Sequence, residues 1–135
     1  MEFGCAIARL VLVTVNSANK AKELEYVLRQ SDAAGLFLTD EYRGHNMLAT
    51  ANQVRNNLPS LREIICITDF EHFMNTGNRP TKFPEIRPEA PFVIMYTSGT
   101  TGYPKGAILH NKGMTNSTNF MAERAGMKAG GAWIM

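Results

Sequence analysis

The chain has 135 residues, which is enough for one domain with a hydrophobic core. Hydrophobic residues make up 44% of the chain and charged residues 19%, a composition that excludes a disordered or fibrous protein. The net charge is only +2 and the lysines and arginines are scattered, so no basic patch of the kind that binds nucleic acid is present. We therefore expect a globular protein that does not bind nucleic acid.

Metal, redox and membrane sites are not indicated by the sequence. Cys5 and Cys66 lie far apart in apolar stretches, which predicts free, buried thiols in a reducing compartment, the cytoplasm or the mitochondrion. The three histidines are isolated from one another, so we expect no metal site. The apolar run 3–15 is too short to span a bilayer and carries Arg9 inside it, so we expect no transmembrane segment.

Hydrophobic patterns in the first half of the chain alternate between strand and helix. Residues 3–9 fit the end of a helix, and residues 10–15 form a continuous, β-branched apolar run that is typical of a buried parallel strand. From about Lys20 the apolar residues recur on one face of a helix. The predicted face consists of Ala21, Leu24, Val27 and Leu28.

The same alternation continues to residue 68. After a break at Gly35, residues 36–39 predict a short strand, and residues 63–68 predict another. Between them lies an amphipathic segment whose apolar face consists of Met47, Leu48, Ala51 and Val54. Strand, helix, strand, helix and strand with short connections predict an α/β fold, in which βαβ units form a parallel sheet.

The second half of the chain begins with a different composition. Residues 75–91 contain four prolines and few apolar residues, which predicts an extended excursion. A strand is expected at 92–96, an apolar run follows at 106–109, and residues 111–127 have a helical pattern. Met114, Met121 and Ala125 share one side of that helix, and we expect the methionines to fill the core. Residues 132–135 predict the start of a further strand.

A loop rich in glycine and hydroxyl groups follows the strand at 92–96. Its glycines allow sharp turns that direct backbone N–H groups inward as an anion-binding nest, and Lys105 supplies a mobile cation. These properties predict a cradle for the phosphates of a nucleotide. The candidate nucleotide-binding residues are Thr97, Ser98, Gly99, Thr100, Thr101, Gly102, Tyr103, Pro104 and Lys105. No residue of the chain is identified as catalytic.

Two other interpretations of the loop fit the residues less well. The spacing G-x-x-x-x-G-K-[ST] of a Walker loop is not met, because Pro104 precedes the lysine and Gly106 follows it. A flexible surface linker would not need a lysine and a proline between strand-like flanks.

The segment 96–106 resembles the signature [YF]-T-S-G-[ST]-T-G-x-P-K-G of the adenylate-forming (AMP-binding) superfamily. This superfamily includes acyl-CoA synthetases, adenylation domains of peptide synthetases and luciferases. Two further blocks, 13–31 and 107–113, resemble fatty-acyl-CoA synthetases, so the resemblance covers nearly the whole chain. Ser17 stands where that family usually has proline, and Asn111 where it often has histidine, which removes an imidazole expected near the loop.

The resemblance implies a longer enzyme, of which residues 1–135 are part of the large N-terminal AMP-binding domain. The adenine-binding and ribose-binding motifs of the family and its C-terminal domain with a catalytic lysine do not occur in this sequence. The implied partners are ATP with Mg²⁺, a carboxylic (fatty) acid and coenzyme A. The acid attacks the α-phosphate of ATP, pyrophosphate leaves, and the acyl-adenylate reacts with the thiol of coenzyme A.

Three functional hypotheses follow from these observations. The first is a fragment of a fatty-acid–CoA ligase that is inactive and marginally stable when isolated. The second is another adenylate-forming enzyme, either an aryl-CoA ligase or a peptide-synthetase adenylation domain. The third is a non-catalytic, nucleotide-binding remnant. The sequence does not determine the acyl chain length, the compartment or the oligomeric state.

Overall fold

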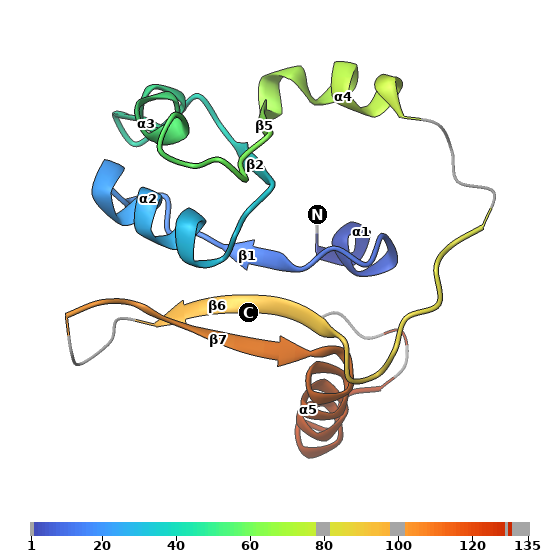
Figure 1. The fold of residues 1–135 in the computed structure, drawn as a ribbon. Helices are drawn as coiled ribbons and strands as arrows, with labels where there is room; N and C mark the ends of the chain where they lie inside the picture. The colour runs from blue at the N-terminus through green and yellow to red at the C-terminus, as the bar shows by residue number, and fades with distance from the viewer. Residues whose placement is uncertain (1, 78–81, 98–101, 129, 131–135) are drawn as a thin grey trace.

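The two residues at the ends of the predicted loop, Thr97 and Lys105, belong to a three-stranded sheet (Figure 1). The computed structural model describes residues 2–77, 82–97, 102–128 and 130. The sheet has the order β1-β6-β7, with β1 at Leu12–Thr14, β6 at Pro91–Thr97 and β7 at Lys105–His110. β1 runs parallel to β6 with Leu12 opposite Val93, whereas β7 runs antiparallel to β6. This antiparallel strand is a departure from the expected parallel sheet, because the connection 98–104 is shorter than the crossover that parallel strands need.

The hairpin of β6 and β7 is irregular at the end away from the loop. Pro91 lies opposite His110 and Val93 lies opposite Leu109, so the register shifts between Pro91 and Val93. From there to the loop the pairing is regular, and it ends with Thr97 opposite Lys105. The shift is a β-bulge, which adds one residue to β6 relative to β7.

A second sheet confirms the predicted βαβ organisation. β2 at Gly35–Leu38 and β5 at Glu63–Cys66 pair in parallel, and α3 at Met47–Arg55 lies between them in the chain. A two-residue strand pair, β3 at Glu41–Tyr42 and β4 at His45–Asn46, precedes α3 and was not predicted. Asn46 caps α3, since its side chain accepts a hydrogen bond from the Ala49 N–H at 2.7 Å.

The main core lies between α2, α3 and the second sheet. α2 spans Ala21–Gln30 and begins with a hydrogen bond from the Lys20 N–H to the Glu23 carboxylate at 2.8 Å. The apolar faces predicted for both helices are confirmed, since Leu24, Val27 and Leu28 of α2 and Ala51 and Val54 of α3 are buried. The core cluster consists of Leu24, Leu28, Leu36, Leu38, Ala51, Val54, Leu58, Leu61 and Cys66.

Polar contacts also tie α2 to the connection between α3 and β5. The Glu25 carboxylate lies 2.6 Å from the Arg29 guanidinium and accepts a hydrogen bond from the Asn57 side chain at 3.1 Å. Arg29 in turn donates to the Asn57 carbonyl at 3.0 Å. The hydrogen bonds from Asn57 and then Arg29 lower the pKa of Glu25. The carboxylate therefore stays charged at neutral pH and holds the helix to this connection.

The remaining helices lie at the periphery. α1 at Glu2–Ile7 leads into β1, and α5 at Asn111–Arg124 follows β7. A 3₁₀ turn, η1 at Ile67–Asp69, and α4 at Phe70–Thr76 were not predicted, and the strand expected at 63–68 ends at Cys66. Within the described part of the chain, no helix has both the length and the apolar character of a membrane span.

The structure differs from two expectations for the second half of the chain. Residues 82–90 contain no helix or strand, but α4 extends to Thr76 and β6 begins at Pro91, so regular elements reach into both ends of the segment 75–91. The expectation that methionines of the last helix fill the core is wrong for Met121, whose side chain is 62% exposed. α5 has no buried residue, because among the described residues only β7 packs closely on it.

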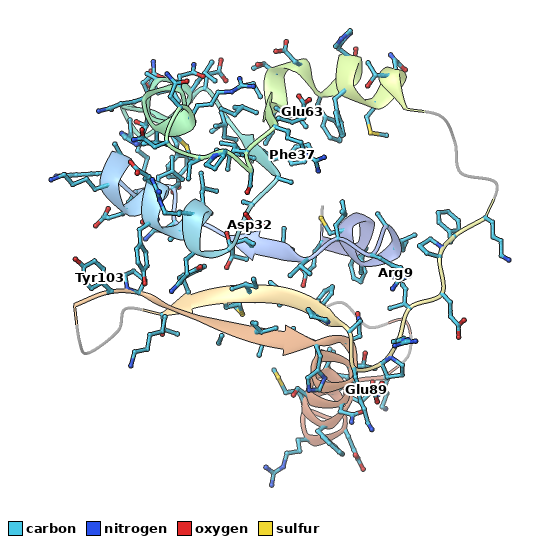
Figure 2. The ribbon with its side chains drawn as sticks, viewed as in Figure 1. Arg9, Asp32, Phe37, Glu63, Glu89 and Tyr103 are labelled. Atoms are coloured by element: carbon cyan, nitrogen blue, oxygen red, sulfur yellow. The ribbon has the colours of Figure 1, made fainter. Side chains whose placement is uncertain are left out.

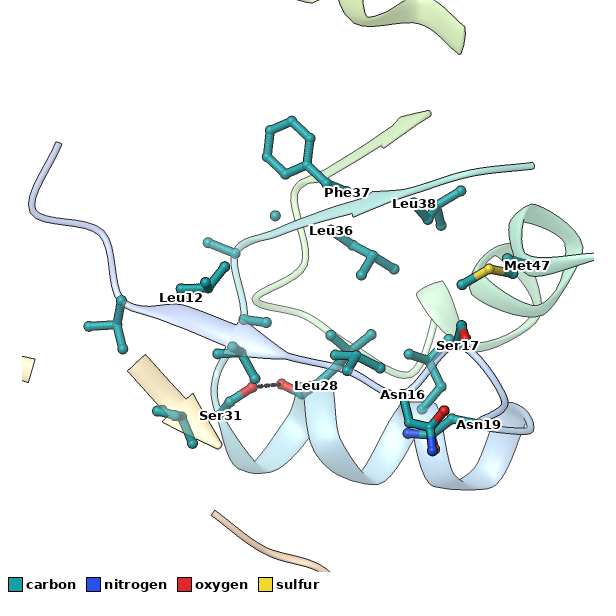
Figure 3. A pocket seen from close by; sticks show the side chains of 18 of the residues that line it. Leu12, Asn16, Ser17, Asn19, Leu28, Ser31, Leu36, Phe37, Leu38 and Met47 are labelled. Carbon is teal, nitrogen blue, oxygen red and sulfur yellow. Dashed lines mark hydrogen bonds between the residues drawn. The ribbon is translucent and has the colours of Figure 1, made fainter. Parts of the chain in front are cut away.

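An apolar cavity of about 670 Å³ separates β1 from β2 (Figure 3). Its walls include Leu12 and Val13 from β1, Leu36 and Phe37 from β2, and Leu28 from α2. In the described part of the chain, β1 pairs only with β6 and β2 pairs only with β5, so each strand turns an unpaired edge toward this space. Unpaired apolar edges favour pairing with other chains.

We expect these edges to make the 135-residue chain associate in solution. Val11 directly precedes β1 and is 41% exposed, so Val11→Lys places a charge beside the open edge without removing a core residue. Size-exclusion chromatography should show a smaller oligomer fraction for this variant than for the unmodified chain. Phe83→Lys, at an exposed residue outside the sheets, is the control and should leave the fraction unchanged. A sharp monomer peak for the unmodified chain would contradict this prediction.

Candidate nucleotide-binding site

The base of the predicted loop is the end of the β6–β7 hairpin. Thr97 is the last residue of β6 and Lys105 is the first of β7, and they lie opposite each other in the register. The Thr97 hydroxyl also donates a hydrogen bond to the Lys105 carbonyl at 3.5 Å. The structure therefore brings these two predicted residues together, with both side chains exposed. Ser98, Gly99, Thr100 and Thr101 lie outside the described residues.

The returning arm of the loop, from Gly102 to Pro104, contacts α2. Gly102 has a φ of 93°, in a region that favours glycine, and so allows the chain to turn back toward β7. The ring centroids of Tyr103 and Tyr26 are 5.4 Å apart, and Figure 2 places Tyr103 at the loop end of the hairpin, beside α2. The Tyr26 hydroxyl donates a hydrogen bond to the Pro104 carbonyl at 3.2 Å.

The outgoing arm of the loop, at Tyr96 in β6, contacts the same helix. The Tyr96 hydroxyl donates a hydrogen bond to the Val27 carbonyl at 3.4 Å. Burial raises the pKa of the Tyr96 phenol, Tyr26 raises it further, and a hydrogen bond with Ser31 partly offsets both. Tyr96 therefore stays protonated at neutral pH, where it acts as a hydrogen-bond donor.

Gly106 allows the Tyr96 ring to lie close to the neighbouring strand. The two residues are cross-strand partners, and a Cβ atom at position 106 would lie 2.9 Å from Ile94 Cγ2 and 3.1 Å from Tyr96 Cζ. These separations are shorter than normal carbon–carbon contacts of about 3.5–4.0 Å. Glycine at this position is therefore a packing requirement of the hairpin below the loop.

Asn111 does not lie near the loop, contrary to the sequence-based expectation. It follows β7, so it is six residues from Lys105, or roughly 20 Å at about 3.3 Å per residue. Its side chain donates a hydrogen bond to the Ala90 carbonyl at 3.2 Å. His110 beside it caps α5, with Nδ1 accepting from the Gly113 N–H at 3.0 Å. The residue type at position 111 thus affects the far end of the hairpin.

The described residues contain no group of three or more His, Cys, Asp or Glu side chains that could hold a metal ion. Both cysteines are free, and Cys66 is buried as expected, whereas Cys5 is only half-buried. None of the candidate residues that the structure describes, namely Thr97, Gly102, Tyr103, Pro104 and Lys105, lines the apolar cavity between β1 and β2.

Comparison with known protein families shows the family to which the chain belongs. All 135 residues match the family described as AMP-binding enzyme. The chain belongs to this family. The fold agrees with that assignment, since the chain superposes on an anthranilate CoA ligase in complex with anthranoyl-AMP with a TM-score of 0.70 and 27% identity, covering 82% of this chain and 21% of that one.

Curated proteins that are similar to this chain are also ligases. A mitochondrial medium-chain acyl-CoA ligase of Rattus norvegicus is 27% identical over 96% of this chain and 25% of its own length. A fatty acid–[acyl-carrier-protein] ligase of Streptomyces coeruleorubidus is 34% identical over 82% of this chain and 20% of its own length. The chain thus spans about a quarter of the length of the curated relatives that it matches.

Sequence analysis missed the contacts that hold the predicted loop in place. Tyr26 belonged to a recognised sequence block, but nothing in that block indicated a contact with Pro104, which is 78 positions away. Tyr96 and Gly106 are the first and last residues of the signature, and the alternation of Tyr96 with Ile94 could have indicated a shared face of the hairpin. These contacts could not be predicted because the residues lie far apart along the chain, not because their sequence motifs are weak.

We expect Gly106→Ala to destabilise the hairpin below the loop. The added methyl group overlaps Ile94 and Tyr96, and such overpacking typically lowers the free energy of unfolding by about 1–3 kcal/mol. Gly35→Ala in β2 is the matched control, because no atom lies within 4 Å of its added Cβ. Chemical denaturation of the two variants measures the difference. Equal stabilities would show that the space above Gly106 is not restricted.

Proposed function

We propose that the chain supplies the phosphate-binding part of an ATP-dependent ligase that activates a carboxylic acid as its adenylate. The observation that carries the proposal is the pairing of Thr97 with Lys105, which fixes both ends of a glycine-rich and hydroxyl-rich loop between two strands. A loop whose two ends are fixed, and whose sequence supplies backbone N–H groups, hydroxyls and one cation, has the chemistry to bind a polyphosphate. The family supports the adenylate-forming reaction class.

Within this proposal the loop binds and orients the β- and γ-phosphates of ATP. Lys105 begins β7 with an exposed side chain, so its ammonium group can offset phosphate charge while its backbone stays paired with Thr97. The hydroxyl of Thr97 adds a neutral donor or acceptor at the same level of the hairpin. Holding pyrophosphate still while the carboxylate oxygen attacks the α-phosphorus keeps attack and departure in line. The bond from the α-phosphorus to the pyrophosphate oxygen then breaks.

The described residues do not form a binding site for Mg²⁺ by themselves, since no cluster of acidic or histidine ligands is found among them. Hydroxyl and lysine groups suit phosphate oxygens better than a divalent cation, which prefers carboxylates and phosphates. Mg²⁺ bound to ATP would supply further charge neutralisation of the phosphates. The contribution of this chain is the phosphate contact at Thr97 and Lys105.

For the acid substrate we propose a fatty acid, with coenzyme A as the thiol that accepts the acyl group. Support comes from the relatives named for medium-chain and fatty acids and from the resemblance of the block 13–31. The similarity of the chain to an anthranilate CoA ligase makes an aryl acid the second candidate for the substrate. A panel of fatty and aromatic acids, each assayed for adenylate formation, distinguishes the two. The mitochondrial relative and the free cysteines also support a location in the cytoplasm or the mitochondrion, which we include in the proposal.

Substitutions at the base of the loop test the proposal in the full natural polypeptide that carries these residues. Lys105→Ala, and Thr97→Ala combined with Thr100→Ala, remove groups that contact phosphate. We expect each to slow ATP–pyrophosphate exchange by at least about tenfold, equivalent to ~1.4 kcal/mol, while binding of the acid changes little.

Lys112→Ala is the matched control for the lysine. Lys112 is exposed and lies in the first turn of α5, at the opposite end of the hairpin from the loop. This variant should retain full exchange activity. If the loop variants also retain it, the assignment of the loop to phosphate binding is wrong.

We further propose that the 135-residue chain does not complete the reaction alone, because it spans about a quarter of the length of its relatives. Incubation with ATP, Mg²⁺, a fatty acid and coenzyme A should give no AMP or thioester above a protein-free control. Turnover well above that control would contradict this proposal. It would also mean that residues 1–135 contain the complete catalytic machinery.

A further inference from the structure

Helix α2 contacts the phosphate-binding loop on both of its arms. Tyr26 donates to the carbonyl of Pro104 on the returning arm, and Tyr96 on the outgoing arm donates to the carbonyl of Val27. Two neighbouring residues of one helical turn thus meet the two ends of the loop, one through its side chain and one through its backbone. The hairpin pairing fixes the separation of the loop ends, and α2 fixes their orientation relative to the core.

The hydroxyl of Tyr26 is itself oriented by α2. The Gln30 amide donates a hydrogen bond to the Tyr26 oxygen at 3.1 Å from one helical turn further on. Because this contact uses an acceptor position of the phenol, the Tyr26 O–H remains available to donate to Pro104. The carbonyl of Pro104 accepts at 3.2 Å. Gln30, Tyr26 and Pro104 thus form a directed chain of hydrogen bonds from the helix to the loop.

Aromatic contact strengthens the same junction. The Tyr103 ring lies 5.4 Å from the Tyr26 ring at an interplanar angle of 36°. Tyr103 is otherwise 69% exposed, so Tyr26 is a main surface against which this part of the loop rests. A tilted aromatic pair of this kind is favourable beyond the area that it buries. The residue that follows the left-handed Gly102 is therefore held by stacking, and the next residue by a hydrogen bond.

We propose that Tyr26 is a positioning residue for ATP, which holds the returning arm of the phosphate-binding loop so that Lys105 faces the phosphates. This inference rests on the function proposed above and adds a residue to it that makes no contact with ATP. Lys105 directly follows Pro104, so loss of the hydrogen bond at Pro104 frees the chain next to the lysine. The core side of α2, which contains Leu24 and Leu28, anchors Tyr26 to the rest of the molecule.

Tyr26→Phe tests the inference because it removes only the hydroxyl. In the full natural polypeptide that carries these residues, hydrogen exchange of peptides covering 96–106 should become faster, while peptides covering β2 and β5 keep their rates. The KM for ATP should rise about three- to tenfold, as expected for the loss of one hydrogen bond, with the KM for the acid unchanged. Gln30→Leu should change the same quantities in the same direction, but less.

Tyr42→Phe is the matched control, because it removes a tyrosine hydroxyl from the exposed strand β3. It should change neither exchange at 96–106 nor the KM for ATP. Faster exchange throughout the protein in Tyr26→Phe would reveal a general stabilising role and overturn the inference. Unchanged exchange at 96–106 would overturn it as well.

The experiment also separates this inference from the proposed function. If Lys105→Ala raises the KM for ATP and Tyr26→Phe does not, phosphate binding stands and the role of Tyr26 is wrong. If Lys105→Ala leaves ATP kinetics unchanged, the proposed function fails, and the role of Tyr26 toward ATP fails with it. The exchange rates at 96–106 then still decide whether Tyr26 holds the loop.

Discussion

The parallel pairing of β1 with β6 is the constraint on which the site depends. It joins segments about 80 residues apart, with Leu12 opposite Val93, and places the strand that precedes α2 beside the hairpin that carries the loop. Parallel strands end at the same edge of a sheet, so the turn after β1 and the loop after β6 emerge together. α2 follows that turn, and for this reason its residues reach the loop. Without this pairing, the contacts of Tyr26 and Tyr96 with the opposite segment would not form.

Local patterns predicted much of the fold because the elements concerned are amphipathic or continuously apolar. The faces of α2 and α3 followed from helical spacing alone, since burial of Leu24, Val27, Ala51 and Val54 needs only one apolar side. β3 and β4 have two residues each, too few to produce a periodic pattern. α4 carries Phe70, Phe73 and Met74 at helical spacing, but these side chains are 39–59% exposed, and the helix lies next to a proline-rich segment that predicts extended chain.

Some features of the candidate site could be predicted from the sequence, and others could not. The signature made Thr97 and Lys105 candidates for phosphate binding, because that chemistry restricts residue types and their spacing. The orientation of β7 and the position of Asn111 depend on how the chain leaves the loop, which the residue types did not reveal. Contacts such as that between Tyr26 and Pro104 depend on the register of strands distant in sequence. A single sequence contains no direct information on such a register.

The bulge between Pro91 and Val93 acts on the loop from the far end of the hairpin. Side chains of a strand alternate between faces, so the extra residue sets the phase of every later position in β6. Tyr96 points toward α2 in this phase, and the opposite phase would direct it away. An insertion or deletion at Pro91 would therefore change how Tyr96 and the end of β6 face α2, while leaving the residues of the proposed phosphate-binding loop intact. A change in the length of β6, in evolution or by design, can thus alter the site from the far end of the hairpin.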